Sequence, residues 1–369
     1  MRSSPIRKPT SSSLRSSLPA KERISHQSPP PTGEPLVEVT RGDLVESVHR
    51  IAACAVDDSG RAYLAIGDVD APVYLRSSAK PFIAASVIAA GAREAFGLTQ
   101  PEIAVMAASH DGEPFHVEAV ASILRKIGAS VDDLQCGTHL PYDEASARTL
   151  LRAGEPPNAL YNNCSGKHAG ILALCKLIGA DQATYLDAAN PAQRHILAFC
   201  ARMSDDDPET WPLAVDGCGI PVYATSLRRT ALAFARFATL RGVSPADAAA
   251  LAIVRDAMVA YPAYVSGTNG FDAALMEAGA GDIACKVGAE GVHVVAAIAS
   301  GLGYASKVID GATRGRSPAT LEALRALGVL DRAQVTKLAA FARPVLYNRA
   351  GRVVGEVRCR PIVAIEKAR

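Results

Sequence analysis

Strand-like segments lie at the two ends of this 369-residue chain, and helix-like segments fill its middle. Runs rich in β-branched and apolar residues, bounded by turn residues, predict short strands over 36–39, 47–56, 61–67, 292–298, 304–309, 344–347 and 353–358. Asp57-Asp58-Ser59-Gly60 joins the second and third of these as a hairpin turn. The pattern predicts an α+β fold, an α/β/α sandwich with one sheet assembled from both termini and covered by a helical middle.

The helical middle is predicted from apolar residues at helical spacing and from proline and acidic residues at helix starts. The expected helices run over 77–91, 101–107, 118–127, 168–178, 191–203, 227–240 and 245–260, with one more over 317–327 among the late strands. The chain has no internal repeat and no linker that would separate two domains. We therefore expect residues 34–369 to form a single domain.

The first 33 residues differ in composition from the rest of the chain. They contain six basic residues against the single acid Glu22, the serine run Ser11-Ser12-Ser13 and three consecutive prolines at 29–31. Such a segment buries too little apolar surface to order itself, so we predict a disordered, basic, Ser/Pro-rich tail over 1–33. Its acid-poor, Arg/Ser-rich character would also suit an organellar transit peptide.

The charge, hydropathy and cysteine content of the chain limit its partners and compartment. Residues 34–369 carry 33 basic and 36 acidic residues, which argues against a body that binds nucleic acid. No stretch of 18 or more apolar residues predicts a membrane span, and no apolar segment of a secretion signal is present. Eight cysteines without a C-x-x-C pair in a long chain argue against a disulfide framework. We expect a cytoplasmic protein without a nucleic-acid or membrane partner.

Arg76-Ser77-Ser78-Ala79-Lys80-Pro81 places a serine three residues before a lysine, where an apolar helix is expected to begin. Positions i and i+3 share one helix face, so the Lys80 amine can reach the Ser77 hydroxyl. A lysine that loses solvent can act as the general base that a serine nucleophile needs. Ser78 should point away from Lys80, which favours Ser77. By itself the Ser-x-x-Lys pattern is also typical of a solvated helix face.

Two further clusters extend this pattern. Ser109-His110-Asp111-Gly112 follows a predicted helix, and Lys286-Val287-Gly288 precedes a predicted strand. Ser-x-x-Lys, Ser-x-Asp and Lys-x-Gly in this order resemble, in layout, the motifs of serine β-lactamases and penicillin-binding proteins. Structural interpretations stay open, because Ser109 could cap a helix, His110 and Asp111 could be solvated, and Lys286 could be an edge charge that discourages strand pairing.

Two glycine-containing clusters carry cysteines. Asn163-Cys164-Ser165-Gly166-Lys167-His168 precedes an apolar helix, and Asp216-Gly217-Cys218-Gly219 lies elsewhere in the chain. Thiolates suit zinc, and two cysteines with one more donor would make an open four-coordinate site. A lysine amine is an unusual ligand because zinc must displace its proton. Buried structural roles for Cys164 and His168 and a turn role for Asp216 therefore remain open from the residues alone.

Taken together, these segments resemble the rhizobial-type L-asparaginases, the thermolabile asparaginase or asparaginase II family. The resemblance rests on Arg76 to Pro81, Ala108-Ser109-His110, Asn163 to His168 and Asp216-Gly217-Cys218-Gly219-Ile220-Pro221. Residues 42–50, Gly267-Thr268-Asn269-Gly270-Phe271-Asp272 and Lys286-Val287-Gly288-Ala289 look like further parts of the same pattern. The similarity extends from about residue 36 to 365 and omits only the tail.

The resemblance implies an amidohydrolase that converts L-asparagine to L-aspartate and ammonia on a serine β-lactamase-like fold. It implies two Ser–Lys pairs, Ser77 with Lys80 and Ser109 with Lys286. It also implies Zn²⁺ held by Cys164, Lys167 and Cys218, substrate contacts from Arg76, His168 and Asp216, and a homodimer. The guanidinium of Arg76 would suit the carboxylate of the asparagine zwitterion, and Asp216 its α-ammonium.

Other functions stay open at this stage. A related serine amidase, a glutaminase or a penicillin-recognising hydrolase could use the same first motif. A non-catalytic zinc-binding or asparagine-sensing protein could keep the pocket without turnover. The presence of Ser77, Lys80, Ser109 and Lys286 together argues against the sensor, because a sensor has no need of the whole set.

Overall fold

The computed structural model describes residues 31–368, so residues 1–30 of the predicted tail lie outside the described part. Eight strands form one antiparallel sheet in the order β10-β11-β1-β2-β9-β8-β7, with β3 pairing with β2 beside this row. The N-terminal strands are β1 (Glu34–Arg41), β2 (Leu44–Val56) and β3 (Ala62–Ile66). The C-terminal strands are β7 (Ile283–Gly288), β8 (Val292–Ala297), β9 (Leu302–Val308), β10 (Val345–Tyr347) and β11 (Val353–Cys359).

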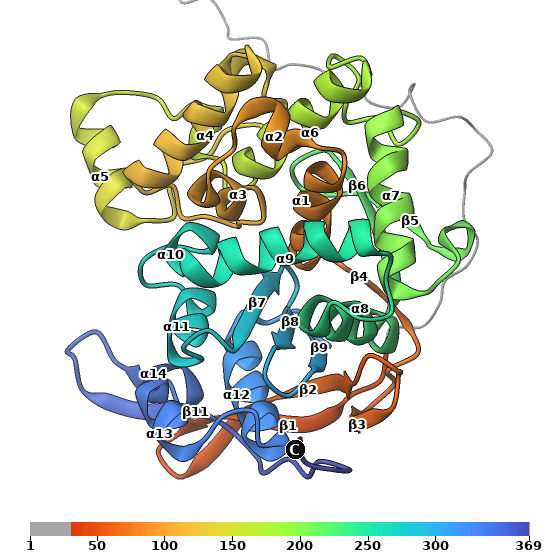
Figure 1. Ribbon diagram of the computed structural model, residues 1–369. Helices are drawn as coiled ribbons and strands as arrows, with labels where there is room; N and C mark the ends of the chain where they lie inside the picture. The colour runs from red at the N-terminus through yellow and green to blue at the C-terminus, as the bar shows by residue number, and fades with distance from the viewer. Residues whose placement is uncertain (1–30, 369) are drawn as a thin grey trace, which may run out of the picture. The chain divides into compact units, whose positions relative to one another are not determined.

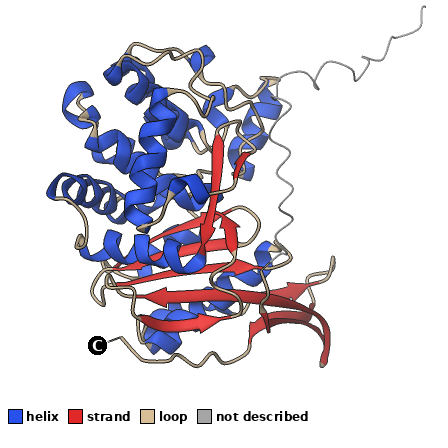
Figure 2. Ribbon diagram, turned by 90° about the vertical axis from the view of Figure 1, so that its right-hand side faces the viewer, coloured by secondary structure: helices blue, strands red, loops and turns tan. Residues whose placement is uncertain are grey.

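The long strand β2 joins the two ends of the chain into this sheet (Figure 2). Its first half pairs with β1, and its buried second half pairs with β9, where Ala53 lies opposite Ser306. On the other side of β1, Val37 lies opposite Cys359 of β11. The prediction of a sheet built from both termini is therefore confirmed.

Helices cover both faces of the sheet at β9. Gly303 lies directly against Ala231 and Ala235 of α8 (Leu227–Thr239). The next residue, Tyr304, faces the other side, where α12 (Arg316–Leu327) packs against β9. Because successive side chains of a strand point to opposite faces, α8 and α12 lie on opposite sides of the sheet (Figure 1).

The middle of the chain forms a helical layer beside α8 (Figure 1). Its helices are α1 (Lys80–Ala89), α2 (Ala92–Phe96), α3 (Gln100–Met106), α4 (Pro114–Ile127), α5 (Glu144–Ala153), α6 (Ser165–Ile178), α7 (Pro191–Ser204), α9 (Pro245–Ala260), α10 (Pro262–Val265) and α11 (Phe271–Ala278). A small antiparallel sheet of β4 (Pro72–Tyr74), β6 (Pro221–Ser226) and β5 (Leu213–Val215) accompanies them. Two short helices, α13 (Arg332–Lys337) and α14 (Ala339–Ala342), precede β10.

The predicted helices and strands are all present, with shifted boundaries, and several elements were not predicted. The helix expected from Ser77 begins as a 3₁₀ turn over Arg76–Ala79 and continues as α1 from Lys80. The unpredicted elements are β4, β5, β6, β7, α2, α5, α10, α11, α13 and α14. Most of them are shorter than two helical turns or six residues of strand, so their periodicity is too brief to be distinctive.

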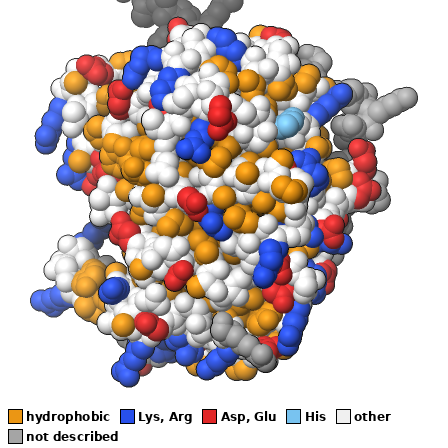
Figure 3. All heavy atoms as spheres, in the orientation of Figure 1, with side chains coloured by type: hydrophobic (Ala, Val, Ile, Leu, Met, Phe, Trp, Pro, Cys, Tyr) orange, Lys and Arg blue, Asp and Glu red, His pale blue; other side chains and the backbone are white. Residues whose placement is uncertain are grey.

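The face of the molecule that Figure 3 shows carries both positive and negative side chains. On that face, Lys and Arg side chains alternate with Asp and Glu side chains, in keeping with the near-neutral composition of residues 34–369. Among the helices that the structure describes, we find none with the length and apolar character needed to cross a membrane.

Replacing Gly303 by alanine should destabilise the fold, because the added methyl group would overlap the backbone of α8 at Ala231 and Ala235. Overpacking of this kind costs about 1–3 kcal/mol, and a rigid backbone neighbour places the change at the upper end. Denaturant unfolding of Gly303→Ala should show this loss. Gly217→Ala is the matched control, because an added Cβ there meets no atom within 4 Å. Equal stability of the two variants would contradict the close packing of α8 on β9.

Candidate active site

Ser77 lies in the 3₁₀ turn that connects β4 to α1. The preceding residue, Arg76, has φ 51°, in a left-handed conformation that is uncommon outside glycine and often marks functional sites. Ser78 is 1% exposed, and its hydroxyl donates to the Leu75 carbonyl at 2.5 Å. Ser77 is half-buried, and its hydroxyl has no hydrogen-bond partner within residues 31–368. Of the two adjacent serines, Ser77 therefore has the available hydroxyl.

The amine of Lys80 is completely buried between three segments of the helical layer. It donates to the Ala108 carbonyl at 2.6 Å, to the Ser109 hydroxyl at 2.9 Å and to the Asn163 carbonyl at 3.3 Å. Burial lowers the pKa of Lys80, although the Cys164 thiol opposes this effect. The lysine of the first motif thus contacts the serine of the second, a pairing that the sequence did not predict.

Lys286 lies on β7, the last strand of the large sheet, and is also completely buried. Its amine donates to the Val287 carbonyl at 3.1 Å and lies 3.6 Å from the Asp272 carboxylate. Burial lowers the pKa of Lys286 to about 8, against the opposing effect of Asp272. Lys80 lowers this pKa further, so the two lysines lie close enough to influence each other. Within the described residues, no hydrogen bond joins Lys286 to Ser109.

Asp272 of α11 holds Lys286 from the edge of the sheet. Its carboxylate accepts the Val287 backbone N–H at 2.8 Å, a donor that faces outward from the edge strand β7. Its other oxygen binds His293 Nε2 at 3.0 Å, and His293 Nδ1 lies 3.1 Å from the Thr320 hydroxyl. Burial alone would raise the pKa of Asp272, but Lys286 and His293 hold it well below its ordinary value. The carboxylate is thus satisfied on every side.

Asp272, Cys285 and His293 bring three metal-ligand types close together, yet their chemistry does not favour a cation. Their ligand atoms lie within 4.8 Å of one another, and all three side chains are buried. Both oxygens of Asp272 are already engaged, and the Lys286 ammonium lies beside them. We interpret this group as a hydrogen-bonded support for Lys286.

Cys164, Lys167 and Cys218 meet at the first turn of α6. Cys164 directly precedes this helix, and Cys218 comes from the tight turn between β5 and β6. The Lys167 amine lies 2.9 Å from the Cys218 sulfur. The Cys164 thiol interacts with both Cys218 and Lys80. Cys164 and Lys167 lie about one helical turn apart, and the fold brings Cys218, which is distant in the sequence, to them.

The donor set of this thiol cluster fits a zinc ion. The hydrogen bond from Cys218, aided by Lys167 and Lys80, lowers the pKa of Cys164 well below its ordinary value despite burial. A buried thiolate beside a second thiol and an amine provides the soft donors that zinc prefers. Although burial disfavours its charge, Lys167 has a raised pKa because of the two sulfur atoms. Zinc binding through this amine therefore requires the loss of its proton.

Arg76 and Asp216, the two residues expected to bind the ends of the substrate, form an ion pair with each other. Arg76 Nε donates to Asp216 Oδ1 at 2.7 Å, and the Gly217 N–H donates to the same oxygen at 2.8 Å. Burial favours the neutral acid, but Lys167, Gly217 and Arg76 together lower the pKa of Asp216. Because the charge of Lys167 lowers the pKa of Asp216, the ion pair must lie close to the thiol cluster.

His168, the remaining predicted substrate contact, is completely buried in the first turn of α6. Its Nδ1 lies 2.7 Å from the Tyr185 hydroxyl, and its Nε2 has no partner in the described part of the chain. Sequence reasoning did not find Tyr185, Asp272 or His293. Asp272 lies in one of the segments that carry the family resemblance, but the resemblance assigned it no role. No local sequence signal marks the other two.

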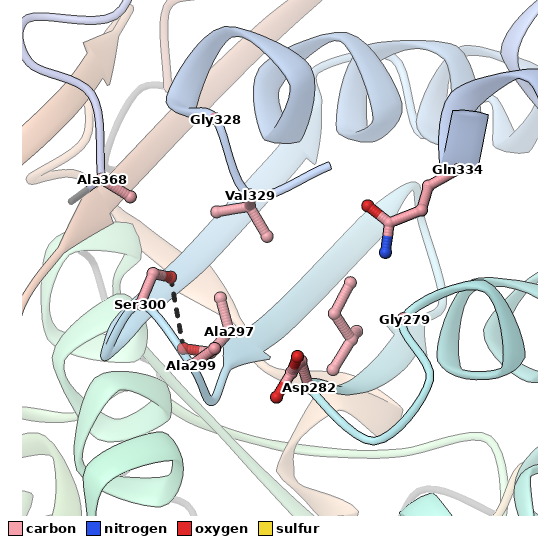
Figure 4. A pocket seen from close by; sticks show the side chains of 10 residues that line it. Gly279, Asp282, Ala297, Ala299, Ser300, Gly328, Val329, Gln334 and Ala368 are labelled. Atoms are coloured by element: carbon pink, nitrogen blue, oxygen red, sulfur yellow. Dashed lines mark hydrogen bonds between the residues drawn. The ribbon is translucent and has the colours of Figure 1, made fainter. Parts of the chain in front are cut away.

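A separate hollow lies between the end of the β7–β8 hairpin and α13 (Figure 4). Its lining includes Asp282, Ser300 and Gln334, and none of the predicted site residues. The Ser300 hydroxyl donates to the Ala297 carbonyl at 3.4 Å, and Gln334 donates to the Ala278 carbonyl at 3.0 Å. Among the described residues, this lining contains no lysine that could serve Ser300 as a base, unlike the serine–lysine cluster.

The comparison with known families identifies the class of protein. The L-asparaginase II family model matches residues 37–359. The chain therefore belongs to the asparaginase II family, and this membership supports an amidohydrolase of the asparaginase kind. Among curated proteins, none matches the chain.

Solved structures give only distant similarities. A crystal structure of Mglu in its native form in 4.3 M NaCl is 16% identical, with a TM-score of 0.40, and the match covers 82% of this chain and 66% of that chain. A structure of Mglu in its L-glutamate binding form is 14% identical, with a TM-score of 0.34, and the match covers 81% and 62%. The chain thus spans slightly less than two thirds of the length of these Mglu chains.

Removing Lys286 should change how stability depends on pH. Its folded pKa of about 8 lies below the unfolded value of about 10.4, so the unfolded chain binds more protons between these pH values. The contribution of Lys286 to stability therefore rises with pH across this window, by on the order of 3 kcal/mol. Denaturant unfolding from pH 7.5 to 10.5 should show this rise in the wild type and a flatter profile in Lys286→Met.

The exposed Lys337 provides a matched control for this measurement. Lys337→Met should keep the wild-type slope, because it removes an exposed lysine that lies outside the buried site. Parallel profiles for the wild type and Lys286→Met would contradict the lowered pKa of Lys286 in the folded chain.

Proposed function

We propose that this protein hydrolyses L-asparagine to L-aspartate and ammonia by nucleophilic catalysis, with Ser77 as the nucleophile. The observation that carries the proposal is the buried amine of Lys80, in contact with Ser109 and one turn from the free hydroxyl of Ser77. Family membership supports amide hydrolysis as the reaction class. A serine nucleophile with a desolvated lysine beside it is the arrangement such a reaction needs.

The proposed proton path follows the contacts of Lys80. Ser77 Oγ attacks the side-chain amide carbon, and neutral Lys80 takes the hydroxyl proton. Ser109 accepts a hydrogen bond from Lys80 at 2.9 Å, so it can pass this proton to the departing nitrogen, which leaves as ammonia. Water then attacks the acyl-enzyme, returns a proton to Ser77 and releases L-aspartate. Lys167 adds positive charge near Lys80, which favours the neutral form of Lys80.

Arg76 and Asp216 are proposed to bind the amino-acid end of the substrate. Their ion pair brings a guanidinium and a carboxylate together at the cluster, and the α-carboxylate and α-ammonium of an amino acid complement these two groups. Holding both charged groups fixes the side-chain amide relative to Ser77, which supplies the orientation part of catalysis.

Cys164, Lys167 and Cys218 are proposed to hold Zn²⁺. A zinc ion there would supply a Lewis acid or a fixed positive charge beside the reacting amide. The thiol cluster is also coupled to the residues of the proposed reaction. Cys164 raises the pKa of Lys80, and Lys167 lowers the pKa of Asp216. A change in the thiol cluster should therefore alter both the proton path and substrate binding.

We also infer a serine β-lactamase-like fold and a homodimer. The fold is supported by an antiparallel sheet built from both termini, with helices on both faces and a helical layer beside it. The placement of Ser77 and Lys80 at the start of α1, with Lys286 on the edge strand β7, has the layout of that class. The homodimer follows from the family resemblance.

Ammonia release from L-asparagine tests the proposed nucleophile. Ser77→Ala should lower the rate by at least about 10³-fold, because no other hydroxyl takes the place of the nucleophile. Ser78→Ala should keep most of the activity, since its hydroxyl only bonds the Leu75 carbonyl. The reverse result would move the nucleophile to Ser78.

The same assay separates the alternative functions. Faster ammonia release from L-glutamine would favour a glutaminase, and cleavage of a chromogenic β-lactam would favour a penicillin-recognising hydrolase. Binding of L-asparagine by calorimetry without ammonia release from the wild type would favour an amino-acid sensor. Each of these results would overturn the asparaginase proposal.

Metal analysis of the purified protein tests the proposed zinc site. The wild type should bind about one zinc per chain after dialysis against zinc, and Cys164→Ser and Cys218→Ser should bind much less, because a serine hydroxyl is a poor zinc ligand. Cys175→Ser is the matched control, a buried cysteine about three turns beyond Cys164 along α6. Equal zinc content in all four proteins would contradict the site.

A further inference from the structure

His168 presents a polar atom that nothing in its surroundings satisfies. The ring is completely buried at the start of α6, and its Nδ1 lies 2.7 Å from the Tyr185 hydroxyl. Its Nε2 is buried and has no hydrogen-bond partner within residues 31–368. A buried polar atom of this kind needs an explanation, because native structures leave few of them unpaired.

The hydrogen bonds of Tyr185 determine which nitrogen of His168 carries the proton. The Gln135 backbone N–H donates to the Tyr185 hydroxyl oxygen at 2.7 Å. A phenol has one hydrogen to donate, and His168 Nδ1 is the remaining group within reach. If Nδ1 carried a proton instead, it would compete for the oxygen and leave the buried phenol hydrogen without an acceptor. The arrangement that satisfies most groups has Nδ1 as acceptor and the proton on Nε2.

The free Nε2–H then has a restricted set of partners. Lys167 and Lys80 are the charged groups that act on the ring, and an ammonium cannot accept a hydrogen bond. A protonated Nε2 has no lone pair for a metal, so in this tautomer the ring cannot join Cys164 and Cys218 as a ligand. What it can bind is an oxygen with a free lone pair, such as that of a carboxylate or an amide carbonyl.

We propose that Tyr185 is a positioning residue, whose hydroxyl holds His168 in the Nε2–H tautomer so that His168 donates a hydrogen bond to an oxygen of the substrate. The substrate part of this inference rests on the proposed amide hydrolysis. The tautomer part rests only on the contacts of Tyr185, Gln135 and His168.

Tyr185 is built rigidly enough for this role. Its side chain is completely buried, and its ring meets His168 edge to face, with centroids 5.5 Å apart. Its backbone carbonyl accepts the Gln193 side-chain amide at 2.7 Å, which fixes the segment between α6 and α7. The tyrosine therefore has bonds at both its backbone and its hydroxyl, and the orientation of His168 follows from them.

The tautomer can be observed directly by ¹⁵N nuclear magnetic resonance of histidine-labelled protein, with His168→Leu identifying the signal. In the wild type we expect a pyridine-type shift for Nδ1 of His168 and a pyrrole-type shift for Nε2. Tyr185→Phe should move both shifts toward the average of the two tautomers, because Nδ1 loses its donor. A protonated Nδ1 in the wild type, or unchanged shifts in Tyr185→Phe, would overturn the proposal.

Kinetics test whether Tyr185 acts through His168. Tyr185→Phe should lower kcat/KM for L-asparagine by about tenfold, the effect of one misdirected hydrogen bond. In a His168→Leu background the same substitution should cost less than about twofold, because the donor is already absent. An equal loss in both backgrounds would indicate a merely structural tyrosine and overturn the positioning role.

Tyr264→Phe serves as the control for loss of a tyrosine hydroxyl in the helical layer. Its ring, on α10, packs against Phe115 and Tyr261, so the substitution should leave both the His168 shifts and kcat/KM unchanged. Failure of the wild type to release ammonia from L-asparagine would refute the proposed function alone. The resonance measurement needs no turnover and would still decide whether Tyr185 sets the tautomer.

Discussion

The buried amine of Lys80 is the contact on which the arrangement of the helical layer around the site depends. It joins the start of α1 to the end of α3 through the Ala108 carbonyl and Ser109, and to the approach of α6 through the Asn163 carbonyl. A buried ammonium is costly unless hydrogen-bond acceptors surround it, so these segments must keep their oxygens on the amine. The lowered pKa of Lys80 reflects the remaining cost. Because burial disfavours the charged form, it also makes the neutral amine, which can act as a base, easier to reach.

A second buried lysine reaches the same region from the sheet. Lys286 comes from β7, where Asp272 accepts the backbone N–H of Val287, while the hydrogen bonds of Lys80 go to the helical layer. Each buried ammonium disfavours the charge of the other, yet only Lys286 has a carboxylate beside it. This asymmetry gives the two lysines different roles, with Asp272 supporting the charge of Lys286 and Ser109 receiving the hydrogen bond of Lys80.

Local patterns predicted a sheet shared by both termini and the spacing of Ser77 and Lys80, but not the hydrogen-bond partners of Lys80. Strands at both termini required a shared sheet, and Ser77 and Lys80 lie one turn apart as their spacing indicated. The partner of Lys80 could not be predicted this way, because a lysine side chain is long enough to cross from one element to another. Asp272 binds the edge of β7, and Tyr185 reaches His168 from a loop, so both act through tertiary packing that leaves no periodic trace in the sequence.

If the thiol cluster binds zinc and the ion pair beside it binds substrate, as proposed, electrostatics would couple the two events. Lys167 lies 2.9 Å from the Cys218 sulfur and also helps to keep Asp216 ionised. If zinc were bound, the proton of Lys167 would be released to solvent, and the metal, with two thiolates that largely neutralise its charge, would replace the ammonium that supports Asp216. Asp216 would then depend more on Arg76, or on the α-ammonium of a bound amino acid. The carboxylate that pairs with Arg76 in this structure would thereby become available to a cationic ligand.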